Sequence, residues 1–157
     1  MKSKALKKFK KLKTVPKVKL KFKPTKLTKK PLSSTNKKVK FLRKIFDKNT
    51  FNLREESMVV MFGRDLIPIG YFSMSKGDKE SVHTDSQFLI QMLILSGADG
   101  FIISHNHPLD KITPSDEDFQ FTISIKKVAD FFGFTFIDHI ILNDKKYYSF
   151  DDRGLIW

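Results

Sequence analysis

SHNHPLDKITPSDED, residues 104–118, is the stretch of this 157-residue sequence that decides its fold. It continues a short apolar strand expected at residues 101–104 and runs through a polar loop to Ser115, where a helix can begin. In an extended segment, residues two apart point to the same side, so His105 and His107 can offer both imidazoles to one ion. The stretch therefore predicts a strand, a loop and a helix arranged around a candidate metal site.

The third candidate ligand is Asp118, eleven residues beyond His107 at the start of the expected helix. A proline-punctuated loop of that length can fold back to bring the carboxylate to the imidazoles. Two nitrogens and one oxygen leave a fourth tetrahedral position open for water, which is how proteins hold catalytic zinc. The sequence has no cysteine, so thiolate sites and disulfides are excluded and Zn²⁺ held by His105, His107 and Asp118 is the expected cofactor.

A base must collect the proton of a water whose pKa zinc would lower to about 7. Glu56 stands just before the apolar residues 58–62, where its carboxylate could hang over the sheet edge toward the metal, and Glu55 is its rival. The hydroxyl of Ser115 could hydrogen-bond the oxyanion formed at a scissile carbonyl. Ser115-x-x-Asp118 alone is a common helix-capping box, so only its combination with His-x-His and the glutamate favours a metal site.

Outside this stretch, strands and helices alternate, which predicts a layered α/β domain with a mixed sheet. Pro68 indicates an edge strand or a bulge in the second strand of a hairpin that turns at residues 63–65. The expected strands are 57–62, 66–74, 101–104, 135–142 and 147–150, and the expected helices begin near Thr84 or Asp85 and at Ser115 and end at Gly97 or Gly100 and at Gly133. The expected core includes Phe88, Leu89, Met92 and Leu95 on the first helix. It also includes Phe131, Phe132, Phe134 and Phe136, which flank the end of the second helix.

The charge divides the chain into two parts. Residues 1–48 carry 20 Lys and Arg against one acid, a net +19, whereas the remainder carries 10 against 16, a net −6. Up to about residue 40, lysines alternate with single apolar residues, so we expect a Lys-rich disordered tail and junction at 1–48 and a folded domain at 49–157. Helical spacing of apolar residues within 41–51 predicts a short amphipathic turn.

The basic tail favours a polyanionic partner, DNA or RNA, whose binding would weaken with added salt. The alternative is a solubilising tail without a specific partner. Lysines interrupt every apolar run near the N-terminus and no later run could span a bilayer, so a soluble, cytoplasmic protein without a membrane partner is the default.

The spacing His-x-His, seven residues, Ser, two residues, Asp is that of the JAMM motif, and the sequence resembles the JAB/MPN metalloproteases at these positions. It resembles the RadC-type branch more closely, over roughly residues 56–155. The residues that carry this closer resemblance are His105-Asn106-His107-Pro108, Thr113-Pro114-Ser115, Asp138-His139-Ile140-Ile141 and Tyr147-Tyr148-Ser149-Phe150.

The resemblance implies a zinc-binding domain of cytidine-deaminase-like α/β layout, with Glu56 as general base and Ser115 as hydrogen-bond donor in the transition state. It implies metallopeptidase activity on a protein or peptide substrate, at peptide or isopeptide bonds, and the branch also carries a DNA-repair label. The sequence departs from the branch at Leu109-Asp110, where Ser-Gly is usual. The helix that usually precedes the first strand looks truncated or replaced by the lysine tail.

Two other functions remain open. The protein could be a nucleic-acid-associated accessory whose JAB domain is a scaffold. It could also be a metal-dependent nuclease, which a single nitrogen-rich metal site favours less than paired metals would. Asp138 and His139 interrupt an apolar strand, so we expect a core or outer-shell role for them, and His83 is either a capping residue or a neighbour of the site.

Overall fold

The computed structural model describes residues 21–27, 29–76, 86–108 and 112–156. Five strands form one sheet in the order β2-β1-β3-β4-β5, in which β3 and β4 are parallel and the other pairs are antiparallel. The predicted α/β fold with a mixed sheet is therefore confirmed. The elements are α2 (Thr35–Ile45), β1 (Glu56–Phe62), the 3-10 helix η1 (Arg64–Leu66), β2 (Pro68–Lys76), α3 (Ser86–Ser96), β3 (Gly100–Asn106), α4 (Asp116–Phe132), β4 (Thr135–Leu142) and β5 (Tyr147–Ser149).

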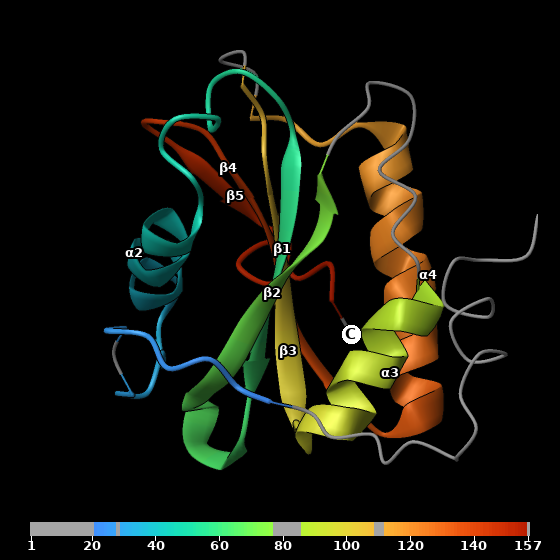
Figure 1. The fold of residues 1–157 in the computed structure, drawn as a ribbon. Coiled ribbons are helices and arrows are strands. Elements are labelled where there is room, and N and C mark those ends of the chain that lie inside the picture. Colours follow the sequence, from blue (N-terminus) through green and yellow to red (C-terminus); the bar gives the residue numbers. More distant parts are fainter. Residues whose placement is uncertain (1–20, 28, 77–85, 109–111, 157) are drawn as a thin grey trace, which may run out of the picture.

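The sheet lies between two helical layers, with α2 on one face and α3 and α4 on the other (Figure 1). Side chains alternate along β1, so Met58 and Val60 join the core under α2. Val59 and Met61 join the second core, under α3 and α4. Because both faces are covered, every residue of β1 and of β3 is buried.

The connection from β3 through α4 to β4 positions the candidate site. A parallel pair of strands needs a crossover, and here the crossover is α4. The carboxyl end of β3 and the first turn of α4 therefore lie together at one end of the strands. Open α/β sheets bind ligands at the carboxyl ends of their strands. The backbone N–H of His107 donates to the carbonyl of Leu142 at 2.8 Å and continues the β3–β4 pairing to that end of the strands.

The helix α4 begins and ends where the sequence predicted. Ser115 is its N-cap in a capping box with Asp118, and Gly133 is its C-cap with φ of +75°, a left-handed conformation that glycine adopts without steric cost. The predicted hairpin is also present, since β1 and β2 pair antiparallel and Pro68 is the first residue of the edge strand. Short-range patterns were sufficient for these elements.

The structure has a helix before the first strand, where the expectation was a helix truncated or replaced by the lysine tail. The helix α2 begins at Thr35, capped by Ser34, and its buried residues include Phe41, Leu42 and Ile45. The predicted helical spacing in this region is thus confirmed, but the helix begins at Thr35, before the turn expected within residues 41–51. The core under α2 consequently includes residues before 49, and Leu32 also belongs to it. The predicted disorder of the tail concerns, for residues 1–20, a segment outside the described part.

Several aromatic and aliphatic residues predicted in the core are exposed. Leu89 is buried as expected, but Phe88 is 39% and Leu95 60% exposed. Because α3 is apolar around its whole circumference, periodicity cannot indicate which face packs. Phe131 is 84% exposed, since the buried stripe of α4 runs through Thr122, Ile125 and Ala129 and leaves that ring on the far side. Phe132 is also exposed, at 49%, whereas Phe136 is buried as predicted. Within the described residues, no helix is long and apolar enough to cross a membrane.

Candidate metal centre

Three predicted ligands lie together where β3 ends and α4 begins. His105 Nε2 lies 3.0 Å from His107 Nε2 and 3.2 Å from Asp118 Oδ1, and His107 Nε2 lies 3.7 Å from Asp118 Oδ2. One ligand atom from each residue lies within 4.8 Å of the other two. Two imidazole nitrogens and a carboxylate directed at one point are electron-rich, and a cation between them offsets their repulsion. The donor set therefore fits a metal ion, and the group can hold one.

Burial favours the neutral form of His105 and of His139 behind it. Burial lowers the pKa of His105 to about 4, with the Asp118 carboxylate opposing the shift and His107 adding to it. Burial, followed by the neighbouring His105 and His107, also places the pKa of His139 well below its usual range. Neutral imidazole is the form that binds metals, so at neutral pH His105 needs no deprotonation before it can act as a ligand.

The Asp118 carboxylate has two roles at the start of α4. Its Oδ2 accepts the backbone N–H of Ser115 at 2.8 Å and the Ser115 hydroxyl at 2.9 Å, while the Asp118 N–H donates back to Ser115 Oγ at 3.1 Å. The capping box considered above as an alternative is therefore present together with the metal group. Ser115 lies beside the ligands, and its hydroxyl proton is directed to Asp118.

Glu56 is the first residue of β1, and its side chain is held by the loop that precedes the strand. Its Oε1 accepts Arg54 Nε at 2.9 Å and Thr50 Oγ1 at 2.8 Å, and the residue is only 2% exposed. Alternation places Glu56 on the α2 side of the sheet, whereas Ser57 pairs with His105 and shares its face. The His-His-Asp group does not include Glu56.

Comparison with known proteins identifies the family of this chain. The sequence matches the family described as RadC-like JAB domain over residues 32–155. The chain belongs to this family. The resemblance predicted from the sequence is thus confirmed, and the match begins before α2, so it includes the helix that the sequence pattern underestimated.

Relatives of this RadC-like JAB domain include UPF0758 proteins of several bacteria. A UPF0758 protein of Aquifex aeolicus is 32% identical over 113 residues, which cover 71% of this chain and 48% of the relative. A UPF0758 protein of Flavobacterium johnsoniae is 33% identical over 101 residues, covering 64% of this chain and 44% of the relative. The chain therefore spans about half the length of the curated relatives it matches.

Asn106, between the two histidines, holds the loop before β1, a role that sequence reasoning missed. Its buried side chain donates from Nδ2 to the carbonyls of Phe51 and Arg54 and accepts the backbone N–H of Glu56 at 2.7 Å. The amide thus fastens the loop that carries Glu56 to the strand that carries the ligands. The signal in the sequence was an amide side chain at the end of an apolar strand. Burying an amide is costly unless its hydrogen bonds are satisfied.

The second polar pair of the RadC-like JAB domain, Asp138 and His139, lies outside the metal group. Asp138 accepts Ser149 Oγ at 2.8 Å and lies 3.3 Å from the ammonium of Lys38, which α2 contributes. His139 lies behind His105, with its Nε2 3.0 Å from His105 Nδ1. Neither residue is a member of the His-His-Asp group, and His83 and Asp110 lie outside the described residues.

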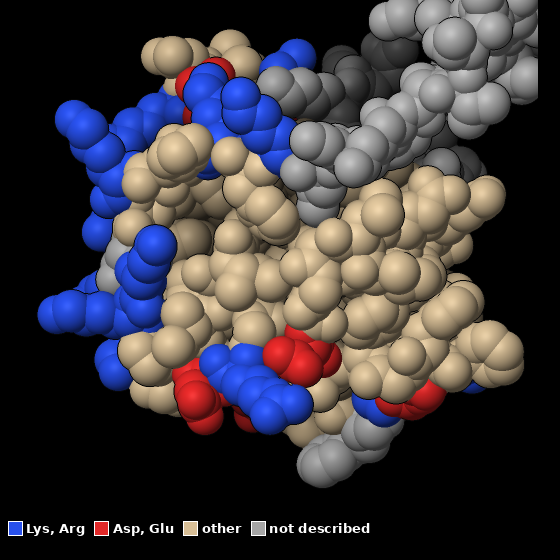
Figure 2. Space-filling view, turned by 60° about the horizontal axis from the view of Figure 1, so that its bottom comes forward, with Lys and Arg blue, Asp and Glu red and all other residues tan. Residues whose placement is uncertain are grey.

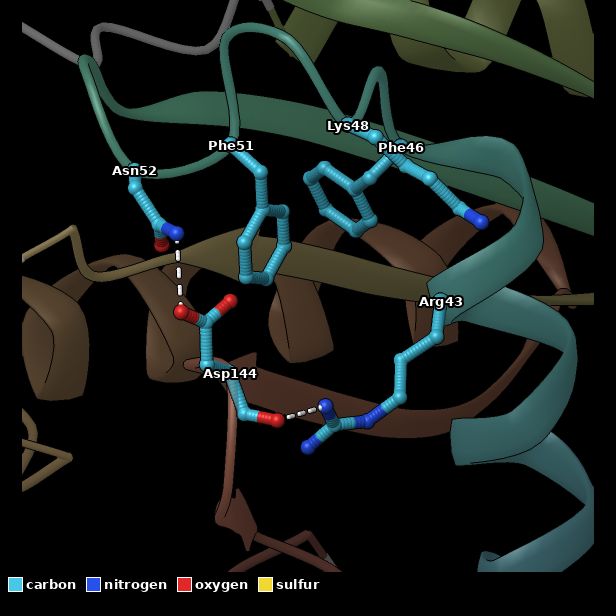
Figure 3. A pocket seen from close by; sticks show the side chains of 6 residues that line it. All are labelled: Arg43, Phe46, Lys48, Phe51, Asn52 and Asp144. Atoms are coloured by element: carbon cyan, nitrogen blue, oxygen red, sulfur yellow. Dashed lines mark hydrogen bonds between the residues drawn. The ribbon is translucent and has the colours of Figure 1, made fainter.

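A hollow of about 410 Å³ borders the loop before β1 (Figure 3). The rings of Phe46 and Phe51 pack edge to face at its floor, and the Asn52 amide donates to Asp144 at 2.8 Å. Arg43 donates to the backbone carbonyl of Asp144, so its guanidinium fastens the β4–β5 turn. None of the residues that line this hollow belongs to the His-His-Asp group, and the metal centre lies outside it.

Proposed function

We propose that this RadC-like JAB domain is a zinc-dependent metallopeptidase that hydrolyses peptide or isopeptide amide bonds. The observation that carries the proposal is the convergence of His105, His107 and Asp118, whose ligand atoms lie within 4.8 Å of one another at the carboxyl end of β3. Two nitrogens and one carboxylate form a three-ligand set of the type used by catalytic zinc. Zinc bound there would polarise the scissile carbonyl and make water more acidic.

The remaining chemistry is assigned to the chain's own residues. Glu56 takes the proton of the attacking water and passes it to the amine nitrogen that leaves as the amide C–N bond breaks, and Ser115 donates a hydrogen bond to the carbonyl oxygen as negative charge develops on it. Both contacts of the Glu56 carboxylate use Oε1, so Oε2 is the atom assigned to the water. Arg54 holds the carboxylate of the base in position through the 2.9 Å contact.

Zinc content and amide cleavage test this proposal on the full chain. We expect one zinc per chain by elemental analysis, cleavage of members of a peptide and isopeptide library, and loss of both with His105→Ala. A protein that binds no stoichiometric zinc, or that cleaves no member of the library when loaded, contradicts the proposal.

Glu55 offers a matched control for the base, because it is the exposed neighbour of Glu56 and carries the same charge. Glu56→Gln is expected to lower turnover by about 10²-fold or more while zinc stays bound, whereas Glu55→Gln retains the activity of the parent. The reverse result would assign the base to Glu55.

A second function, binding of nucleic acid by the basic segment, is proposed on a separate observation. Between residues 21 and 48 the chain has 11 Lys and Arg against one acid, and α2 exposes Lys37, Lys40 and Lys44 while its other face packs on the sheet. Figure 2 shows blue side chains gathered on the side where α2 lies, next to a broad uncharged surface. The positive charge is thus fixed to the domain, which suits contact with phosphates.

A salt series with single-stranded and duplex DNA and RNA tests this second function. Deletion of residues 2–20 retains every residue of α2, and substitution of Lys37, Lys40 and Lys44 by Gln removes charge from the helix alone. Each phosphate that a lysine no longer neutralises should reduce the slope of log K against log salt by about 0.7–0.9. Binding that neither change weakens would exclude the basic segment as a nucleic-acid site.

A further inference from the structure

His139 is buried with both ring nitrogens in hydrogen-bonding contact. Its Nε2 lies 3.0 Å from His105 Nδ1, and its Nδ1 lies 2.7 Å from Thr122 Oγ1. The ring stacks on Phe150 with centroids 4.8 Å apart and an interplanar angle of 11°, and Phe121 packs edge-on against it. The orientation of the imidazole is therefore fixed by packing as well as by its two polar partners.

The direction of each hydrogen bond follows from the Thr122 hydroxyl. Thr122 Oγ1 donates to the backbone carbonyl of Asp118 at 2.6 Å, and a hydroxyl has only one proton to donate. At the 2.7 Å contact Thr122 must accept, so His139 Nδ1 carries the proton. In a neutral imidazole the other nitrogen is then an acceptor, so His139 Nε2 receives the proton of His105 Nδ1.

This chain of hydrogen bonds determines which nitrogen of His105 is free to bind a metal. With the proton on Nδ1, the lone pair is on Nε2, the atom that faces His107 and Asp118. The same series of hydrogen bonds leads to Asp118. Its backbone carbonyl accepts from Thr122, and its carboxylate belongs to the His-His-Asp group. One ligand on β3 and one on α4 are thereby connected through β4.

We propose that His139 and Thr122 are positioning residues that fix His105 in the Nδ1–H tautomer and thereby present its Nε2 to the metal. This inference rests on the proposed metal site and deepens it. Outer partners of this kind typically contribute 10–100-fold to metal affinity. A residue that only filled space would affect stability but would not determine the tautomer.

Nitrogen-15 NMR of the histidine side chains in the metal-free full chain tests the tautomers directly. The expected result at neutral pH is Nδ1–H for both His105 and His139. Thr122→Val removes the hydroxyl at nearly constant volume and should mix the tautomers of both rings, while Thr122→Ser should restore them. Ser104→Ala is the matched control, because it removes another buried hydroxyl, bonded to the Ile140 carbonyl, without touching the chain of hydrogen bonds.

Zinc competition with a chelator supplies the second measurement. Thr122→Val should bind zinc about 10-fold more weakly than the parent, whereas Thr122→Ser and Ser104→Ala bind within about 2-fold of it. An Nε2–H tautomer of His105 in the parent, or tautomers and zinc affinity unchanged in Thr122→Val, would overturn the inference. The tautomers are measured without metal or substrate, so a failure of hydrolysis alone would contradict the proposed function and leave this result standing.

Discussion

Replacement of Lys38 by Met should destabilise the fold in a strongly pH-dependent way. The ammonium of Lys38 is buried 3.3 Å from Asp138 Oδ2, and the Asp138 side chain is fully inaccessible to solvent. Removing one partner of a buried pair costs about 3–5 kcal/mol, because the remaining charge is left uncompensated. Ser149 Oγ and the Asp151 N–H still donate to the carboxylate, so we expect the lower end, about 3 kcal/mol at pH 8.

The pH dependence follows from the carboxyl group of Asp138. Burial raises its pKa to about 6, although the Lys38 ammonium opposes the shift. Without the ammonium the folded-state pKa rises further, so the folded variant takes up a proton that the unfolded chain lacks. Its stability then falls as pH rises toward that pKa, and the deficit shrinks to about 1 kcal/mol or less at pH 5.

Urea unfolding of the chelator-treated protein at pH 5 and pH 8 measures this effect without a contribution from bound metal. Lys37→Met is the matched control, since it removes the same charge from the exposed side of the same helix and should change the free energy of unfolding by less than about 0.5 kcal/mol. Equal deficits for Lys38→Met at both pH values, or an equal effect of Lys37→Met, would refute the role of the buried pair.

Three further changes test the site and its frame. Zinc at about 100 times its Kd should raise the free energy of unfolding of the parent by about 2.7 kcal/mol, and no rise is expected for Asp118→Asn. Asn106→Ala leaves three backbone groups of the loop before β1 without a partner and should cost about 3 kcal/mol in urea unfolding, against less than about 1 kcal/mol for the exposed Asn52→Ala. Gly133→Ala should cost about 1 kcal/mol in the same assay, because φ there is +75°, whereas Gly63→Ala, at φ of −84°, should be nearly neutral.

The sequence was sufficient to predict that the three candidate ligands would lie together, because their geometry is set locally. His105 and His107 share a side at the end of an extended segment, and Asp118 is fixed by the cap of the following helix. The residues of the strands and of α4 were predictable for the same reason, since alternation, capping residues and glycines act over a few positions. Ser115 lies beside Asp118 as the capping-box spacing predicts, and its role as a hydrogen-bond donor in catalysis stays a prediction.

Features that depend on distant partners were not predictable from the sequence. Lys38 belongs to a run of lysines that looks like a solvated tail, yet it pairs with Asp138, one hundred residues away. The loop contacts that hold Glu56 on the α2 side, through Arg54 and Thr50, left no periodic pattern. Similarly, Phe131 is exposed because the small residues of α4 form its buried stripe, which contradicts a ranking of core residues by hydrophobicity.

The cap of α4 orders the carboxylate of Asp118 without a metal ion. Its Oδ2 accepts two hydrogen bonds from Ser115, which direct Oδ1 toward His105 Nε2 at 3.2 Å. The entropy of ordering this carboxylate is therefore lost on folding rather than on metal binding, which favours affinity. The same arrangement sets a condition on the proposed catalysis. The Ser115 hydroxyl must turn from Asp118 to reach an oxyanion, and the 2.8 Å bond from its backbone N–H can hold the carboxylate in place while it does so.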